Sequence, residues 1–345
     1  MNTIENISYE KGIFNISSHN FNELCLEQFF FQYKNNDLYR QYCDTIKINK
    51  HQVRSIRHIP FLPIRFFKSH DVKTTSFEPQ LIFESSGTTG ISSSRHLVKD
   101  PSLYTKSFTQ TFRMFYGSPD QYCILGLLPS YLEKGHSSLV MMVDTLIKES
   151  GNKLSGFYLH DLTKLHSTLL HNELAGQQTL LIGVTYALLD FAERFPMKLR
   201  NTIVMETGGM KGRRVELTRA QVHRQIQQQM GVPIVHSEYG MTELLSQAYS
   251  KGDGFFHCPP WMRILFREED DPFSIIPAEK IKENGITGII NVIDLANRYS
   301  CPFIATDDIG KIYPNGSFEV LGRMDNSEIR GCTLMVIPFL SGSSL

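Results

Sequence analysis

From residue 80 onward, short apolar runs alternate with amphipathic stretches, and this alternation constrains the fold more than any other feature of the sequence. Residues 179–184 (TLLIGV) have the length and apolarity of a buried strand, and the TYALLDFAERF stretch that follows has helical spacing. Residues 202–205 indicate another strand before a glycine turn, and residues 232–243 (VPIVHSEYGMTE) indicate a strand followed by a loop. This order predicts an α/β fold in which helices flank a mostly parallel sheet.

The predicted helices carry start and stop signals. Apolar positions in residues 136–151 follow helical spacing, with Gly151 as the stop. In residues 217–231, Thr218 is the predicted N-cap and Gly231 closes the helix. Two prolines make residues 58–67 an extended connector, and the Asn-Gly pair in residues 311–320 (KIYPNGSFEV) predicts a hairpin.

Composition excludes several classes of protein. Lys plus Arg and Asp plus Glu are equal at 35 each, so no net field favours nucleic acid or an anionic membrane. No stretch is long and apolar enough to span a membrane, and the start of the chain lacks the features of a signal peptide. The 6 cysteines lie far apart without a CxxC pair, which favours reduced thiols in a cytoplasmic protein over disulfides or a zinc site.

Residues 84–96, ESSGTTGISSSRH, follow the apolar stretch at 80–83 with a run dominated by Ser, Thr and Gly. Composition alone favours a flexible loop. The alternative is a phosphate cradle, in which glycine lets the backbone approach while amides and hydroxyls donate to oxygens. The GxxxxGK[ST] pattern is absent, so the run is not a Walker P-loop.

Polar segments farther along the chain favour the cradle. HSEYGMTELLSQ spans residues 236–247, IATDDIG spans 304–310 with two carboxylates after a predicted strand, and LGRMDNSEIRG spans 321–331. Ligands of open α/β sheets bind beyond the carboxyl ends of strands. We therefore expect the Ser/Thr/Gly run, the glycine turn at 206–212 and the segment from 236 to line one cleft.

Together and in this order, these segments resemble the adenylate-forming superfamily of acyl- and aryl-CoA ligases, luciferases and peptide-synthetase adenylation domains. The resemblance covers roughly residues 80–331 and implies the superfamily's large N-terminal domain, with ATP and Mg²⁺ as cofactors. We expect this domain to span residues 1–320, with a mainly helical part at 1–79. A short tail at 321–345 then follows a hinge-like segment, in place of the superfamily's full C-terminal domain.

The resemblance implies a role for each matched residue. The nucleotide-binding set is Ser85, Ser86, Gly87, Thr88, Thr89 and Gly90 on the β- and γ-phosphates, Gly208 and Gly209 at the adenine turn, Glu238, Tyr239, Gly240, Met241 and Thr242 around adenine and the α-phosphate, Asp308 on the ribose, and Arg323 near ribose and phosphate. Glu243 is the implied Mg²⁺ ligand. Thr242, Glu243, Arg323 and His236 are the implied catalytic residues of this part of the chain, although a structural role is equally open for His236 and for His136.

The sequence departs from the superfamily pattern at one point. The superfamily has a lysine after the phosphate loop, and this chain has ISSSRH there instead. Arg95 is the candidate for that charge. A further match, to the acyl-protein synthetases of the LuxE type, rests on LPSYLEKGHSSLVMMV (128–143), METGGMKGRR (205–214), VHSEYGMTELLSQAYS (235–250) and EIRGC near the end.

The LuxE resemblance implies a fatty acid activated as acyl-AMP, a cysteine near the C-terminus that carries the acyl group, and a reductase or acyltransferase protein as partner. Cys332 is the only cysteine of the tail and fits the carrier role, with a buried structural thiol as the alternative. Two other functions stay open: an acyl- or aryl-CoA ligase without its mobile domain, and a non-catalytic nucleotide-binding protein.

Overall fold

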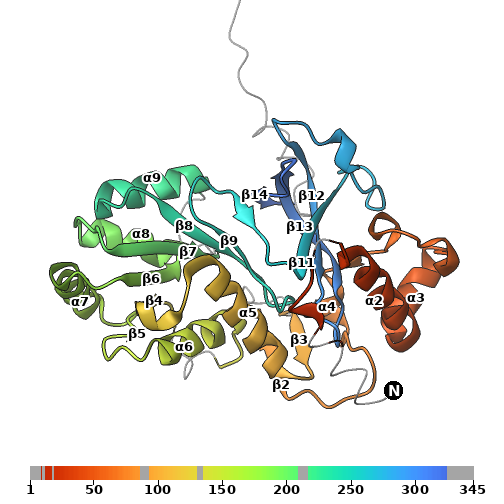
Figure 1. Ribbon diagram of the computed structural model, residues 1–345, viewed down its shortest axis with the longest axis horizontal. Helices are drawn as coiled ribbons and strands as arrows, with labels where there is room; N and C mark the ends of the chain where they lie inside the picture. The colour runs from red at the N-terminus through yellow and green to blue at the C-terminus, as the bar shows by residue number, and fades with distance from the viewer. Residues whose placement is uncertain are drawn as a thin grey trace, which may run out of the picture.

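The computed structural model describes residues 9, 12–17, 19–85, 93–129, 135–208 and 217–324. A 12-stranded sheet runs through it in the order β11-β12-β13-β14-β10-β9-β8-β7-β6-β4-β5, with β1 paired on β13 (Figure 1). A second sheet contains only β2 (Leu81–Glu84) and β3 (Arg95–Val98). The predicted α/β class, a large sheet flanked by helices, is confirmed.

Parallel pairing is confined to one half of the large sheet and to β1 against β13. The parallel half consists of β4 (Cys123–Leu127), β5 (Gly156–Phe157), β6 (Thr179–Val184), β7 (Thr202–Thr207) and β8 (Val235–Tyr239). One face packs on α5 (Pro101–Tyr116) and α6 (Ser138–Ser150), and the other on α7 (Leu162–Ala175), α8 (Thr185–Arg194) and α9 (Arg219–Met230). Both faces of the sheet are covered because side chains alternate along each strand. In β6, Leu180 and Ile182 pack into the core on one face and Leu181 into the core on the other.

The other half is antiparallel. It comprises β9 (Ala248–Ser250), β10 (Phe256–His257), β11 (Met262–Arg267), β12 (Ile286–Asp294), β13 (Phe303–Ile312) and β14 (Phe318–Arg323). Helices α2 (Phe21–Asn35) and α3 (Asp37–Thr45) pack beside it, with the Tyr39 and Phe303 rings 6.3 Å apart. Short elements complete the fold: β1 (Leu62–Pro63), α4 (Phe66–Ser69) and the 3₁₀ turns η1 (Lys50–Gln52), η2 (Ile56–His58), η3 (Pro119–Gln121) and η4 (Ala278–Lys280).

Most of the predicted element ends are confirmed. Gly151 ends α6 in the left-handed conformation, and Thr218 starts α9 in a capping box with Gln221. Gly316, with φ of +81°, turns the chain between β13 and β14. The predicted connector at 58–67 is wrong at its end, because α4 begins at Phe66. A proline restrains itself and the residue before it, so the chain is free to turn into a helix after Pro63.

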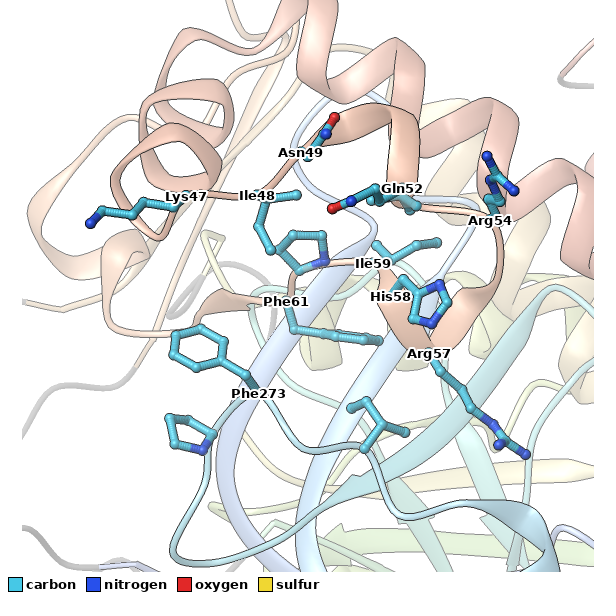
Figure 2. Close-up of a pocket in the computed structure, with 14 residues that line it drawn as sticks. Lys47, Ile48, Asn49, Gln52, Arg54, Arg57, His58, Ile59, Phe61 and Phe273 are labelled. Carbon is cyan, nitrogen blue, oxygen red and sulfur yellow. The ribbon is translucent and has the colours of Figure 1, made fainter.

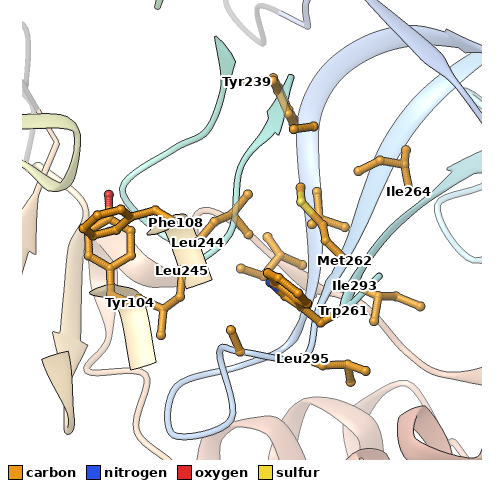
Figure 3. Close-up of a cluster of buried hydrophobic side chains, with 14 of the residues drawn as sticks. Tyr104, Phe108, Tyr239, Leu244, Leu245, Trp261, Met262, Ile264, Ile293 and Leu295 are labelled. Atoms are coloured by element: carbon orange, nitrogen blue, oxygen red, sulfur yellow. The ribbon is translucent and has the colours of Figure 1, made fainter. Parts of the chain in front are cut away.

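A chain of polar side chains fixes the turn that follows β8. It starts at Trp261, which Figure 3 shows among the buried hydrophobic side chains of the core. Trp261, fully buried, donates from Nε1 to Ser107 Oγ (2.9 Å), whose oxygen lies 3.0 Å from Ser246 Oγ. Ser246 Oγ donates to Asp294 (2.6 Å), and the backbone N–H of Leu245 donates to the same carboxylate (2.7 Å). Burial raises the pKa of Asp294 to about 6. These bonds hold the turn carrying Thr242 and Glu243 against α5 and the end of β12.

Candidate active site

The site is built around Tyr239, the last residue of β8, and Asp308 of β13. The Tyr239 hydroxyl donates to Asp308 Oδ2 at 2.8 Å, and the tyrosine ring meets Phe256 and Phe318 edge to face. Asp308 lies inside a strand, so the prediction that the two carboxylates follow a strand is wrong. The strand continues because residues 309–312 pair with β12 and β14.

Asp308 and Asp307 point in different directions, as successive strand residues do. Asp308 is the register partner of Arg323, whose Nε lies 3.9 Å from Oδ1, and the arginine side chain is 61% exposed. Asp307 instead accepts from Arg65 Nε at 3.3 Å. Asp308 therefore has one oxygen on the Tyr239 hydroxyl and the other beside the exposed Arg323 guanidinium.

The turn after β8 is held by side-chain donors to its backbone. Asn297 Nδ2 donates to the carbonyl oxygens of Glu243 (2.8 Å) and Cys301 (3.1 Å). His96 Nδ1 donates to the Thr242 carbonyl oxygen (2.8 Å), and its Nε2 lies 3.0 Å from Asn297 Oδ1. His96 belongs to β3 and Asn297 to the β12–β13 connection. Three segments that are distant in sequence thus fix one turn.

The Glu243 side chain is 5% exposed, and burial raises its pKa. A hydrogen bond with Ser94 and the charge of Arg323 act in the opposite direction, while Asp308 adds to the rise. These influences place Glu243 in electrostatic contact with both Asp308 and Arg323. A bound cation would stabilise the charged form of this buried carboxylate.

The two ends of the Ser/Thr/Gly run meet beside Glu243. Ser94 N–H donates to Ser85 Oγ (2.9 Å), and Ser85 N–H donates to the Ser94 carbonyl (3.1 Å). Since Ser94 also bonds to Glu243, the run that joins β2 to β3 begins and ends at the site. Ser86, Gly87, Thr88, Thr89 and Gly90 lie outside the described residues. Arg95 is exposed and pairs with Asp71 (3.3 Å).

Glu238 lies under the turn. It is 7% exposed and accepts a hydrogen bond from Thr207 Oγ1, and burial raises its pKa to about 7. A Cβ at position 240 would lie 2.5 Å from Glu238 Oε1, so any larger residue there would displace the Glu238 carboxylate. Met241 is half-buried, and its carbonyl closes the turn by accepting from Leu244 N–H (3.1 Å).

The adenine turn predicted from the sequence starts at Gly208, directly after β7 and with φ of +71°. Thr185 Oγ1 lies 3.0 Å from both the Gly208 carbonyl and the Glu206 carboxylate, which share its one hydroxyl hydrogen. Arg219 donates from Nε to Glu206 (3.0 Å) and from Nη1 to the Val320 carbonyl of β14 (2.8 Å). Gly209 lies outside the described residues. The Glu206–Arg219 pair joins the parallel half to β14 and was not predicted.

His236 lies apart from the Tyr239–Asp308 pair. Its Nδ1 is 3.1 Å from the Tyr116 hydroxyl of α5, and burial and the nearby Lys251 lower its pKa to about 4. His136 is exposed, with Nδ1 3.2 Å from the Ile82 carbonyl. Cys332 lies outside the described residues.

Of the predicted residues, the structure therefore brings together Ser85, Tyr239, Thr242, Glu243, Asp308 and Arg323. Within the described part of the chain, no group of three or more His, Cys, Asp and Glu residues could enclose a metal ion. One carboxylate is nevertheless sufficient for Mg²⁺ when substrate phosphates and water complete the coordination.

Comparison with solved structures shows the fold of the adenylate-forming enzymes. The structure matches 2-hydroxyisobutyryl-CoA ligase in its postadenylation state with a TM-score of 0.57 and 10% identity, over 88% of this chain and 67% of that one. It matches the ATP-bound RpMatB–BxBclM chimera B3 with a TM-score of 0.50 and 18% identity. That match covers 72% of this chain but 49% of the chimera, so the chain spans about half its length.

Comparison of the amino-acid sequence with known proteins points to one branch of the adenylate-forming enzymes, the acyl-protein synthetases. The model of the family described as "Acyl-protein synthetase, LuxE" matches residues 7–133. The chain is also 23% identical to the long-chain-fatty-acid–luciferin-component ligase of Aliivibrio fischeri, over 90% of this chain and 86% of that protein. The predicted resemblance is thereby confirmed: this chain is similar in sequence to the LuxE acyl-protein synthetases and has the fold of the adenylate-forming enzymes. None of the helices in the described ranges is long and apolar enough to cross a membrane.

Proposed function

We propose that this chain uses ATP to activate a fatty acid as its acyl-AMP and then transfers the acyl group to a protein cysteine, Cys332. The observation that carries the first step is the convergence of Tyr239, Glu243, Asp308 and Arg323 at one place. The LuxE match and the name of the Aliivibrio fischeri relative support a long-chain fatty acid as the substrate. The acyl group then passes to a reductase or acyltransferase protein.

Activation is needed because a carboxylate is a poor acyl donor, since its leaving group would be oxide. An oxygen of the carboxylate attacks the α-phosphorus of ATP, the bond to the bridging oxygen breaks, and pyrophosphate leaves. Nucleotidyl transfer depends on positioning and charge neutralisation more than on covalent help from the protein. The residues of the site supply both.

Each residue has a role that matches its surroundings. Asp308, with one oxygen on Tyr239, accepts from the ribose hydroxyls with the other, and the exposed Arg323 guanidinium neutralises phosphate charge. Glu243 and the phosphates would hold Mg²⁺, which supplies further charge neutralisation when bound. The Ser85–Ser94 closure holds the ends of the Ser/Thr/Gly run where its amides would face the β- and γ-phosphates.

The second step transfers the acyl group to sulfur. The Cys332 thiolate attacks the acyl carbonyl, AMP leaves with the electron pair of the broken anhydride bond, and a thioester forms. Thiolate is intrinsically a strong nucleophile, even as a small fraction at neutral pH.

The test has two readouts on the same chain. Fatty-acid-dependent exchange of labelled pyrophosphate into ATP reports activation, and a hydroxylamine-sensitive label from radioactive fatty acid reports the thioester. Cys332→Ser should keep the exchange and lose the label. A label that survives would place the carrier elsewhere, release of free acyl-CoA in the presence of CoA would favour a CoA ligase, and ATP binding without exchange for any acid would contradict the proposal.

A further inference from the structure

Asp294, the last residue of β12, is a fully buried carboxylate with an exposed fraction of 0%. Within the described part of the chain it has no ion-pair partner. The cavity of about 730 Å³ shown in Figure 2 lies elsewhere, since its lining residues fall within 47–61 and 272–275. A buried charge destabilises a protein unless hydrogen bonds compensate it, so the groups that bond to this carboxylate decide its state.

Three donors surround the Asp294 side chain. Leu245 N–H donates to Oδ2 (2.7 Å), while the Ser246 hydroxyl (2.6 Å) and Ala296 N–H (3.1 Å) donate to Oδ1. The charged carboxylate accepts from all three, whereas a protonated carboxyl group would lose one of these bonds or reverse the Ser246 hydroxyl. The contacts therefore favour the charged form and oppose the effect of burial, which raises the pKa of Asp294 to about 6.

The hydrogen-bond chain from Trp261 leads to this carboxylate in one direction. The indole N–H can only donate, so Ser107 Oγ accepts from it, and the Ser246 hydroxyl hydrogen is donated to Asp294. The Ser107 hydrogen then forms the contact of 3.0 Å between the two serines. Leu295 N–H donates back to the Trp261 carbonyl (3.0 Å) and closes a ring. A change of charge at Asp294 thus alters the surroundings of the only tryptophan of the chain.

The same carboxylate holds the segment directly beyond Glu243, at Leu245 and Ser246. On the other side, Asn297 Nδ2 donates to the Glu243 carbonyl (2.8 Å), and Asn297 N–H donates to the Asp294 carbonyl (3.0 Å). The Glu243 side chain therefore projects from a segment that is bonded at residues 243, 245 and 246. Such support matters in an active site, since a misplacement of about 1 Å can reduce the rate about 100-fold.

We infer that Asp294, in its charged form, is a positioning residue of the nucleotide site and acts through Leu245 and Ser246 on the turn that carries Glu243. This inference rests on the proposed function, which assigns ATP and Mg²⁺ to that turn. ATP should bind best while Asp294 is charged, because protonation disturbs the bonds to the turn. The affinity is therefore full well above the pKa of about 6 and falls as the pH drops through that value.

The titratable and charged neighbours of Asp294 do not share this role. Cys258 stays neutral, because burial and the Asp294 charge raise the pKa of its thiol. On β11, Met262 is the register partner of Asp294, so Arg263 faces the other side of the sheet. Arg298, on the connection after β12, lies 4.0 and 3.9 Å from the centres of two aromatic rings.

The test is calorimetric titration of the full chain with ATP and Mg²⁺, without fatty acid, in the wild type and Asp294→Asn at pH 8 and pH 5. Asparagine keeps the shape of the side chain and cannot carry the charge. At pH 8 the variant should bind ATP about tenfold more weakly, as expected for a lost hydrogen bond to a charged group. At pH 5 the two affinities should agree within about twofold, because the wild type is then mostly protonated at Asp294. Comparison at each pH cancels the ionisation of ATP and of Glu243, which both proteins share.

Two further variants and a spectroscopic readout control the result. Asp161→Asn removes one charge from an exposed helix N-cap, where asparagine serves equally well, and should bind ATP like the wild type at both pH values. Ser246→Ala keeps the Asp294 charge, removes one donor and should weaken binding at pH 8 about threefold. Trp261 emission, excited where tyrosine does not absorb, should be similar in the wild type at pH 5 and in Asp294→Asn at pH 8, since both lack the charge.

Equal ATP affinity of the wild type and Asp294→Asn at pH 8 would overturn the inference and leave the proposed function intact. A difference between them that persists unchanged at pH 5 would also overturn it, because the cause would then be the substitution and not the charge. If Asp294→Asn does not fold, wild-type affinity in Ser246→Ala with constant wild-type Trp261 emission between the two pH values would overturn it. A wild type that binds no ATP at either pH would overturn the proposed function and this inference together.

Discussion

Tyr239 and Asp308 are 69 residues apart in sequence and share a hydrogen bond of 2.8 Å across the junction of the two halves of the sheet. The tyrosine ends a parallel strand and the aspartate belongs to an antiparallel one. Their contact joins the aromatic residue expected beside adenine to the carboxylate expected on the ribose.

Asp308→Asn should raise the KM for ATP in pyrophosphate exchange about tenfold or more, since hydrogen bonds to charged groups contribute about 1.5–3 kcal/mol. Asp307→Asn is the matched control, because the neighbouring carboxylate faces Arg65. It should change the KM less than about twofold, in the range of a surface substitution. Equal effects of the two variants would contradict the assignment of Asp308.

Glu243→Gln keeps the shape of the side chain and removes the charge expected to hold Mg²⁺. Exchange measured across a Mg²⁺ titration should fall at least about 100-fold, because metal-based charge stabilisation contributes several kcal/mol. Glu269→Gln, on an exposed loop, serves as the control for loss of one carboxylate. A normal Mg²⁺ dependence in Glu243→Gln would remove Glu243 from the site.

Asn297→Ala removes the side-chain amide that donates two hydrogen bonds. The buried carbonyl oxygens of Glu243 and Cys301 then lose these hydrogen bonds. Each unsatisfied buried group costs about 1–3 kcal/mol, so urea unfolding should show a loss of about 2–4 kcal/mol. Asn284→Ala, at an exposed turn, should cost less than about 0.5 kcal/mol. If Asn297→Ala were as stable as that control, the hydrogen bonds would not hold the turn.

Glu238 should make stability depend on pH. Burial raises its pKa in the folded protein to about 7, above the value of about 4.3 for an unfolded glutamate. The folded state therefore keeps the proton longer, and the free energy of unfolding falls as pH rises from about 4.3 to 7.

Glu238→Gln cannot ionise and should escape this loss. At pH 8 it should be more stable than the wild type by about 4 kcal/mol, at roughly 1.4 kcal/mol per unit of pKa, with little difference at pH 4. Denaturant unfolding at both pH values measures the change, and the same stability difference at both would show that ionisation of Glu238 is not its cause.

Helices and strands whose own residues carry a clear pattern, such as an apolar run or a capping residue, could be predicted from the sequence. A continuous apolar run predicted β6 at residues 179–184, and capping residues predicted both ends of α9. The pairing of β2 and β3 in a sheet of their own could not be predicted, because an apolar run does not specify its partner strand. The antiparallel half was missed for the same reason: strand direction is decided by contacts between distant segments.

The residues of the candidate site also fall into those that the sequence could predict and those that it could not. Tyr239, Glu243, Asp308 and Arg323 were predicted as site residues from a family pattern. His96 and Asn297 were missed, since they act on backbone carbonyls of other segments and leave no local pattern. The Glu206–Arg219 pair was missed because a carboxylate at a strand end indicates neither burial nor a partner 13 residues away.

The most direct test of the central claim is a crystal structure of the chain with ATP, Mg²⁺ and a fatty acid. The claim predicts ribose hydroxyls within about 2.5–3.0 Å of Asp308, adenine against the Tyr239 ring, and Mg²⁺ bound by Glu243 and phosphate. A nucleotide bound elsewhere, with Asp308 and Glu243 untouched by it, would contradict the account.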